Sequence, residues 1–251
     1  MIYLDSPIGV GFSFSVNQSF YYLVNDEMTG HYAPQLAQLI LQTKTTKINL
    51  KGIAIGNPLL EFNKDFDSSA DFLWSHGQIQ DSTFELLKTQ AAEEKIDVCV
   101  EHETVTYMNR KEVHNALNAK LVGITHWSTC SSVLVYNFQN LEIPTISILG
   151  TLVKSGVRVL VFSGDQDSVI PFMGTRSLIK GLAKDLGLNT TQAYRAWFRG
   201  KQVAGWTQVY GNILTFATIR GAGHAAPFYQ PGRSLQLFKT FLEGKPLPNR
   251  H

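Results

Sequence analysis

The sequence lacks an excess of charge of either sign. Its 22 Lys and Arg residues are nearly balanced by 20 Asp and Glu residues, so the formal net charge is +2 at pH 7. The two signs are interspersed along the chain. Such a balance gives no reason to expect nucleic acid or an acidic membrane surface as a partner.

Long apolar runs are lacking as well. No stretch approaches the roughly 20 apolar residues that a membrane-spanning helix needs. The 20 Gly and 9 Pro residues follow no triplet period, which excludes a collagen-like chain. The 44% share of hydrophobic residues excludes a disordered chain. A length of 251 residues suffices for one large α/β domain or two small ones.

The chain contains a series of short apolar runs, which alternate with segments whose apolar residues recur at helical spacing. Strands are predicted at residues 2–4, 21–24, 48–55, 157–162, 206–210 and 213–219. Helices are predicted at residues 32–40, 109–121, 146–154, 177–186 and 234–242. Residues 61–121 show no clean strand pattern and are predicted to form a mostly helical insertion. The alternation indicates one α/β domain over residues 1–251, with a mostly parallel sheet covered on both faces.

Polar residues that follow two of the late strands are the candidates for chemistry. Asp165 and Asp167 follow the strand at 157–162, and His224 lies in a Gly-flanked loop after the strand at 213–219. Each signal alone is weak, because Asp-rich turns and loop histidines are common for structural reasons. Together they have the chain order of the acid and base in an α/β-hydrolase triad. The aspartate would then hold the Nδ1 proton of the histidine.

A triad of this order also needs a nucleophile earlier in the chain, on a sharp turn between a strand and a helix. Only residues 22–31 have that pattern, and they contain neither Ser nor Cys. From its residues, the predicted site has an acid and a base but no nucleophile for them to activate.

Eight short motifs extend the argument along nearly the whole chain. They are LDSPIGVGFS at 4–13, GHYAPQLA at 30–37, IAIGNP at 53–58, WSHG at 74–77, YMNRKEV at 107–113, WSTCS at 127–131, SGDQDSVIP at 163–171 and GAGH at 221–224. In this order they resemble the serine carboxypeptidases of peptidase family S10, most closely the plant serine carboxypeptidase-like proteins. The resemblance implies an α/β-hydrolase fold and a Ser-Asp-His triad that releases C-terminal amino acids from peptides. It implies no cofactor and no metal, and a peptide or acyl substrate, since some plant relatives are acyltransferases.

The resemblance assigns roles to five residues. Asp167 and His224 match the catalytic Asp and His of the family. Where the family reads Gly-Glu-Ser-Tyr-Ala-Gly-His-Tyr, this chain has NDEMTGHY at 25–32, so that Glu27 stands at the nucleophilic serine and Asp26 at the preceding Glu. Asp5 stands where the family has a second Glu. Asp5 and Asp26 would therefore recognise the C-terminal carboxylate of a substrate.

These departures predict a catalytically impaired protein. An ionised Glu27 would form an ion pair with His224 and weaken it as a base. The family's Gly-rich oxyanion segment would lie upstream of Met1, and the helix and strand expected between Ser15 and Tyr22 are compressed to a few residues. We therefore expect an α/β-hydrolase fold that is incomplete on its N-terminal side. Two alternatives stay open: a non-catalytic binding protein that uses the old pocket for a basic group, and the unstable product of a decayed gene.

Processing signals are few. Asn17 and Asn189 begin N-glycosylation sequons, which fits a family that is secreted or vacuolar. The first residues do not resemble a signal peptide, so the sequence indicates no compartment. By resemblance, Cys99 and Cys130 would pair with cysteines outside the segments retained here. A disulfide between them and two free thiols stay open as alternatives, and no oligomeric state is predicted.

Overall fold

The computed structural model describes residues 15–17, 29–43, 48–89, 102–117, 126–128 and 143–249. Its contacts divide the chain into two compact units. The larger unit consists of Met28–Glu93 and Glu142–His251, and the smaller one of Met1–Glu27 and Glu94–Leu141. Among the described residues, no helix combines the length and apolar character needed to cross a membrane.

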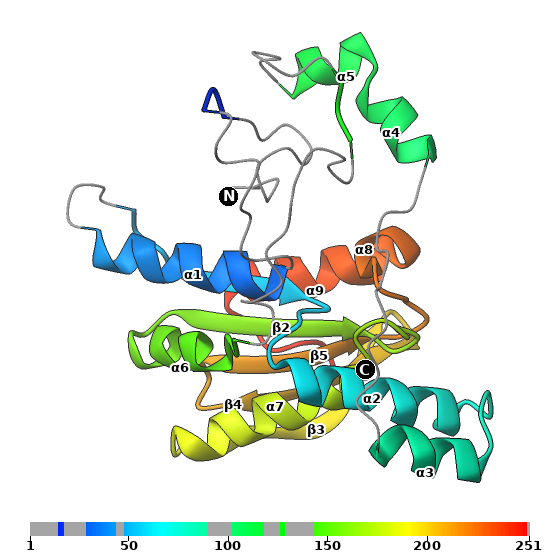
Figure 1. Ribbon diagram of the computed structural model, residues 1–251. Coiled ribbons are helices and arrows are strands. Elements are labelled where there is room, and N and C mark those ends of the chain that lie inside the picture. The colour runs from blue at the N-terminus through cyan, green and yellow to red at the C-terminus, as the bar shows by residue number, and fades with distance from the viewer. Residues whose placement is uncertain are drawn as a thin grey trace. The chain divides into compact units, whose positions relative to one another are not determined.

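The larger unit contains a five-stranded sheet in the order β1-β2-β5-β4-β3 (Figure 1). The strands are β1 Gly52–Gly56, β2 Arg158–Gly164, β3 Thr190–Arg199, β4 Gln202–Tyr210 and β5 Leu214–Ile219. β1, β2 and β5 are parallel to one another, whereas β4 is antiparallel to both β5 and β3. Only β4 therefore runs against the other strands, and the predicted mostly parallel sheet is confirmed.

Helices cover both faces of this sheet. Side chains of β2 alternate between the faces: Val159 and Val161 lie in one buried cluster and Leu160 lies in another. The first cluster is closed by α1 Thr29–Gln42, α6 Ile146–Lys154 and α7 Phe172–Asp185, and the second by Leu237 of α9 Pro231–Glu243. The two layers explain why β2 is a nearly continuous apolar run in the sequence.

All regular elements that the structure describes between residues 61 and 121 are helices, which are joined by turns. In the larger unit, α2 Phe62–Ser75 packs against α7 and against α3 Asp81–Thr89. Glu61 begins α2 by accepting hydrogen bonds from the backbone N–H groups of Asn63 and Lys64, as an N-cap residue does. In the smaller unit, α4 His102–Met108 is followed by α5 Lys111–Ala116. The Asn109 side chain between them bonds both the N–H and the C=O of Trp127.

Several predicted elements match the structure closely. α6 has the predicted bounds, β2 and β5 begin within one residue of prediction, and α9 differs by a few residues. β1 begins only at Gly52, and α7 begins five residues earlier than predicted, directly after Pro171. β3 was not predicted. The strands predicted at 2–4 and 21–24 lie outside the described residues, as does the last part of the helix predicted at 109–121.

Candidate active site

Asp167 lies in the turn that follows β2 and is fully buried. Its Oδ1 atom accepts hydrogen bonds from two backbone N–H groups of the same turn, those of Val169 at 2.9 Å and Ile170 at 3.3 Å. The turn itself therefore supplies the donors that a buried carboxylate requires. One oxygen of Asp167 is fixed by local backbone, and the other is available to the rest of the site.

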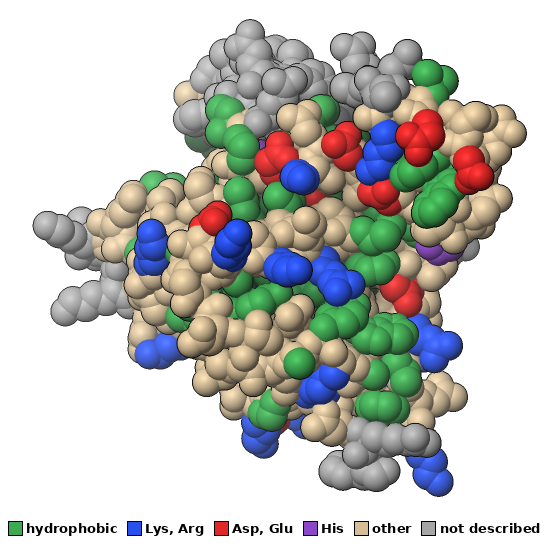
Figure 2. Space-filling model, turned by 90° about the horizontal axis from the view of Figure 1, so that it is seen from below, with side chains coloured by type: hydrophobic (Ala, Val, Ile, Leu, Met, Phe, Trp, Pro, Cys, Tyr) green, Lys and Arg blue, Asp and Glu red, His purple; other side chains and the backbone are tan. Residues whose placement is uncertain are grey.

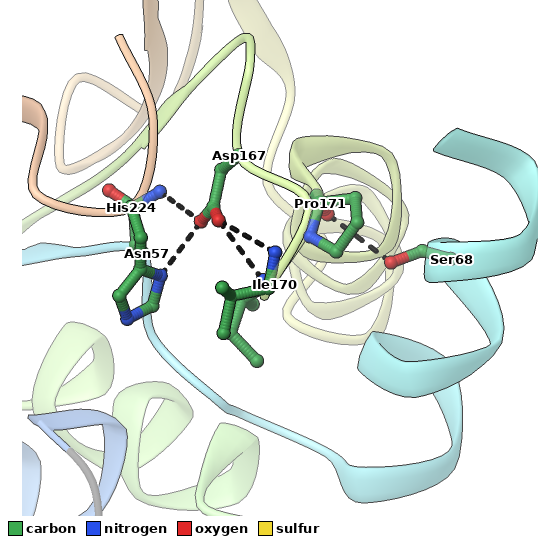
Figure 3. Close-up of polar contacts among 7 residues, drawn as sticks. Asn57, Ser68, Asp167, Ile170, Pro171 and His224 are labelled. Carbon is green, nitrogen blue, oxygen red and sulfur yellow. Dashed lines mark hydrogen bonds and ion pairs between the residues drawn. The ribbon is translucent and has the colours of Figure 1, made fainter. Parts of the chain in front are cut away.

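His224 lies in the loop that follows β5, the strand next to β2. Its Nδ1 atom is 3.0 Å from Oδ2 of Asp167, and its side chain is 32% exposed, against 0% for Asp167 (Figure 3). Because an ionised carboxylate can only accept, the nitrogen that donates is Nδ1, and in the neutral imidazole Nε2 then carries the lone pair. This is the orientation in which a histidine serves as a general base. The two residues that chain order singled out are thus in contact.

Asp165 does not contact His224 but holds the loop on which His224 lies. Its Oδ1 accepts a hydrogen bond from the Gly221 N–H at 2.6 Å, and the Gln166 N–H donates to Ala222 C=O at 2.9 Å. At Gly164, an added Cβ would lie 2.2 Å from Ala222 O, so only glycine permits this approach of the two loops. Of the two candidate aspartates, Asp167 therefore contacts the histidine and Asp165 positions its loop.

Asn57 was not singled out from the sequence, yet it contacts the same carboxylate. It follows β1 directly, and its side-chain Nδ2 donates to Oδ2 of Asp167 (Figure 3). The sequence does carry a signal, because a polar residue at the carboxyl end of a parallel strand lies where such sheets place their reactive groups. Its position between Gly56 and Pro58 favoured the reading of a simple turn.

A second buried acid, Asp65, lies in the first turn of α2. Its Oδ2 accepts the N–H groups of Leu60 at 2.6 Å and Glu61 at 3.0 Å, and its Oδ1 has no partner among the described residues. Burial raises the pKa of Asp65 from 3.8 to about 6, although the two backbone N–H groups lower it. The next turn of α2 approaches the segment that follows Asp167, since Ser68 Oγ donates to Asp65 C=O at 2.6 Å and lies 3.3 Å from Pro171 C=O.

The remaining candidate residues are two acids, the residue at the nucleophile position, two cysteines and two sequon asparagines. Asp5, Asp26, Glu27, Cys99 and Cys130 lie outside the described residues. The sequon residues Asn17 and Asn189 are both exposed. No group of three His, Cys, Asp or Glu side chains within the described part of the chain could hold a metal ion. The face in Figure 2 carries Lys and Arg as well as Asp and Glu side chains, with apolar ones between them.

Comparison with known proteins gives consistent matches over most of the chain. Serine carboxypeptidase-like 45 of Arabidopsis thaliana is 44% identical over 99% of this chain and 74% of its own length, and serine carboxypeptidase-like 46 is 43% identical over 99% and 73%. The first alignment spans 339 positions, against 251 residues in this chain. The relative therefore has residues within the matched stretch that have no counterpart here.

A solved structure supports the fold. The crystal structure of a prohormone-processing carboxypeptidase from Saccharomyces cerevisiae superposes with a TM-score of 0.66 over 94% of this chain and 73% of that one, at 16% identity. At that identity the likeness shows the α/β-hydrolase fold alone. The family model for serine carboxypeptidases matches residues 20–98 and 88–244. With the two plant relatives, this match places the chain in the serine carboxypeptidase family, peptidase family S10.

Proposed function

We propose that this protein is a serine carboxypeptidase-like protein that keeps the aspartate and histidine of the family's catalytic triad but does not cleave peptides. The observation that carries the proposal is the intact Asp167–His224 pair, combined with Glu27, which by resemblance to the family's motif stands at the position of its serine. The pair would still accept a proton from a nucleophile, but the chain supplies no hydroxyl or thiol at that position.

A glutamate would not replace the serine in this reaction. Attack of a carboxylate on a peptide carbonyl would form an anhydride, which is a far less stable product than the ester formed by serine. Removal of the nucleophile from a catalytic triad lowers kcat by about 10⁶-fold in enzymes where it has been measured. We therefore expect hydrolysis by this chain to be about 10⁶-fold slower than by an active family member, which is too slow to be measured above buffer in a routine assay.

The alignment with the plant relative supports the same proposal. Because 339 aligned positions face a chain of 251 residues, segments present in that relative are missing inside the matched region. By resemblance to the family, the motif that should contain the serine lies next to the stretch between Ser15 and Tyr22, where we infer that a helix and a strand are compressed to a few residues. A change in this region would affect the nucleophile without touching the loops after β2 and β5, which carry the acid and the base.

The test is an assay of the recombinant full chain on a blocked dipeptide at mildly acidic pH, with His224→Ala as the matched variant. An active serine carboxypeptidase in the same assay would show that the substrate and conditions are suitable. We expect the chain and the variant to give the same rate as buffer. Hydrolysis that His224→Ala abolishes would overturn the proposal, because it would require a nucleophile activated by that histidine.

A further inference from the structure

The backbone of Asn57 is fixed beside the end of β2. β1 pairs with β2 in parallel register, with Gly56 opposite Phe162, and the Asn57 N–H donates to Phe162 C=O at 2.8 Å. Asn57 has a φ of 45°, in the left-handed region that asparagine adopts more readily than other non-glycine residues. Only 6% of the residue is exposed. The chain therefore holds Asn57 against the strand from which the Asp167 turn departs.

The side chain of Asn57 completes the set of donors around Asp167. Oδ1 of Asp167 accepts the N–H groups of Val169 and Ile170, and Oδ2 accepts from Asn57 Nδ2 and His224 Nδ1 (Figure 3). Each oxygen of the fully buried carboxylate thus has two donors. Asn57 is the only one of the four donors that belongs neither to the turn of Asp167 nor to the loop of His224.

From this arrangement we infer that Asn57 is a positioning residue that fixes the rotation of the Asp167 carboxylate and so the orientation of His224. The terminal torsion of an aspartate has a broad minimum, so backbone donors on one oxygen leave the other oxygen some freedom. The Asn57 amide removes that freedom by holding Oδ2 where it meets the imidazole. The inference concerns the geometry of the Asp–His pair and stands whether or not the chain hydrolyses peptides.

The alternative is that Asn57 is needed only because asparagine tolerates the left-handed backbone conformation at this position. The chain offers a matched control, because Asn212 is the other described non-glycine residue with positive φ, at 55°, and lies exposed between β4 and β5. Glycine at either position keeps the left-handed conformation without strain and removes the side chain. Asn57→Gly and Asn212→Gly therefore share the effect on the backbone, and only Asn57→Gly also removes a buried side chain that contacts Asp167.

The decisive measurement is the proton NMR resonance of His224 Nδ1–H, which a hydrogen bond to a buried carboxylate shifts downfield and protects from exchange. We expect the full chain and Asn212→Gly to show this resonance. Asn57→Gly should lose it to exchange or shift it upfield, while retaining a cooperative thermal transition. An unchanged resonance in Asn57→Gly would overturn the inference, since His224 would then be held without the amide.

A second measurement covers the case in which Asn57→Gly is too unstable for NMR. The fall in Tm caused by Asn57→Gly is measured in the natural sequence and in the Asp167→Ala background. We expect a clearly smaller fall in the second background, because the acceptor is gone, and an equal effect of Asn212→Gly in both. Equal falls for Asn57→Gly in the two backgrounds would mean that the Asn57 side chain stabilises the fold independently of Asp167, and this would overturn the inference.

Discussion

Replacement of Asp65 by Asn tests whether a buried carboxyl makes the stability of this protein depend on pH. Asp65 is 0% exposed, and two backbone N–H groups bond one of its oxygens while the other has no partner in the described structure. The pKa of Asp65 is about 6 in the folded protein, against 3.8 for an unperturbed aspartate. Between these two pH values the folded state binds more protons than the unfolded state.

The direction and size of the effect follow from this difference. Where the folded state binds more protons, the free energy of unfolding falls as pH rises, so stability is lost between pH 3.8 and about 6 and stays low above it. At 1.36 kcal/mol per pKa unit, the full loss is about 3 kcal/mol. Asn cannot ionise, so the variant should lack this loss. The change in the free energy of unfolding that Asp65→Asn causes should therefore be about 2–3 kcal/mol more stabilising at pH 7.5 than at pH 4.

Urea denaturation at pH 4 and pH 7.5 measures this difference directly. Any fixed cost of placing the amide group is the same at both pH values and cancels. Asp67→Asn, on the same helix but exposed, makes the same change of charge and should shift the free energy of unfolding by less than about 0.5 kcal/mol. An effect of Asp65→Asn that is equal at the two pH values would refute the reasoning, because the carboxyl would then titrate alike in both states.

Two further substitutions test the packing of the antiparallel side of the sheet, again by urea denaturation. Gly205→Ala should lower the free energy of unfolding by more than about 3 kcal/mol or abolish folding, because an added Cβ would lie 1.8 Å from Thr218 O. Gly181→Ala in α7 is the control, since its methyl group meets no described atom within 4 Å, and it should raise the free energy of unfolding by up to about 1 kcal/mol. Trp197→Phe should cost about 1–3 kcal/mol, because buried Nε1 donates to Thr218 C=O at 3.0 Å. If either Gly205→Ala or Trp197→Phe left the free energy of unfolding unchanged, it would contradict the close contact of that residue with Thr218 of β5.

The sequence predicted the elements whose side chains face a core on both sides of the sheet. β2 and β5 are buried on both faces and are almost uninterrupted apolar runs, which makes them easy to recognise. β3 is mostly exposed or half-buried, with Trp197 as its one buried residue, and its polar residues obscured the strand pattern. The glycine at position 200 was the signal in the sequence that β3 and β4 form a hairpin, and in the structure its φ is 57°.

In the candidate site too, one part could be predicted from the order of residues in the chain and another part only from the three-dimensional structure. The order of an Asp after one strand and a His after a later one predicted the contact between Asp167 and His224, because parallel neighbours end at one edge of the sheet. Asn57 follows a strand too, but no chain-order rule includes an asparagine at that place. Its role depends on which oxygen of Asp167 it meets, and this becomes visible only in three dimensions.

The geometry of the Asp–His pair also gives a reason why such a pair can persist in a protein that has lost its catalytic activity. Asp167 is held by its own turn and by Asn57, while the loop of His224 is held by Asp165 through Gly221. All of these contacts lie within the loops at the carboxyl ends of β1, β2 and β5. Loss of the nucleophile would leave a buried carboxylate that still requires its donors, and removal of any one of them would cost stability. Stability alone is therefore a reason for such an Asp–His pair to be kept, and its presence does not by itself establish an active triad.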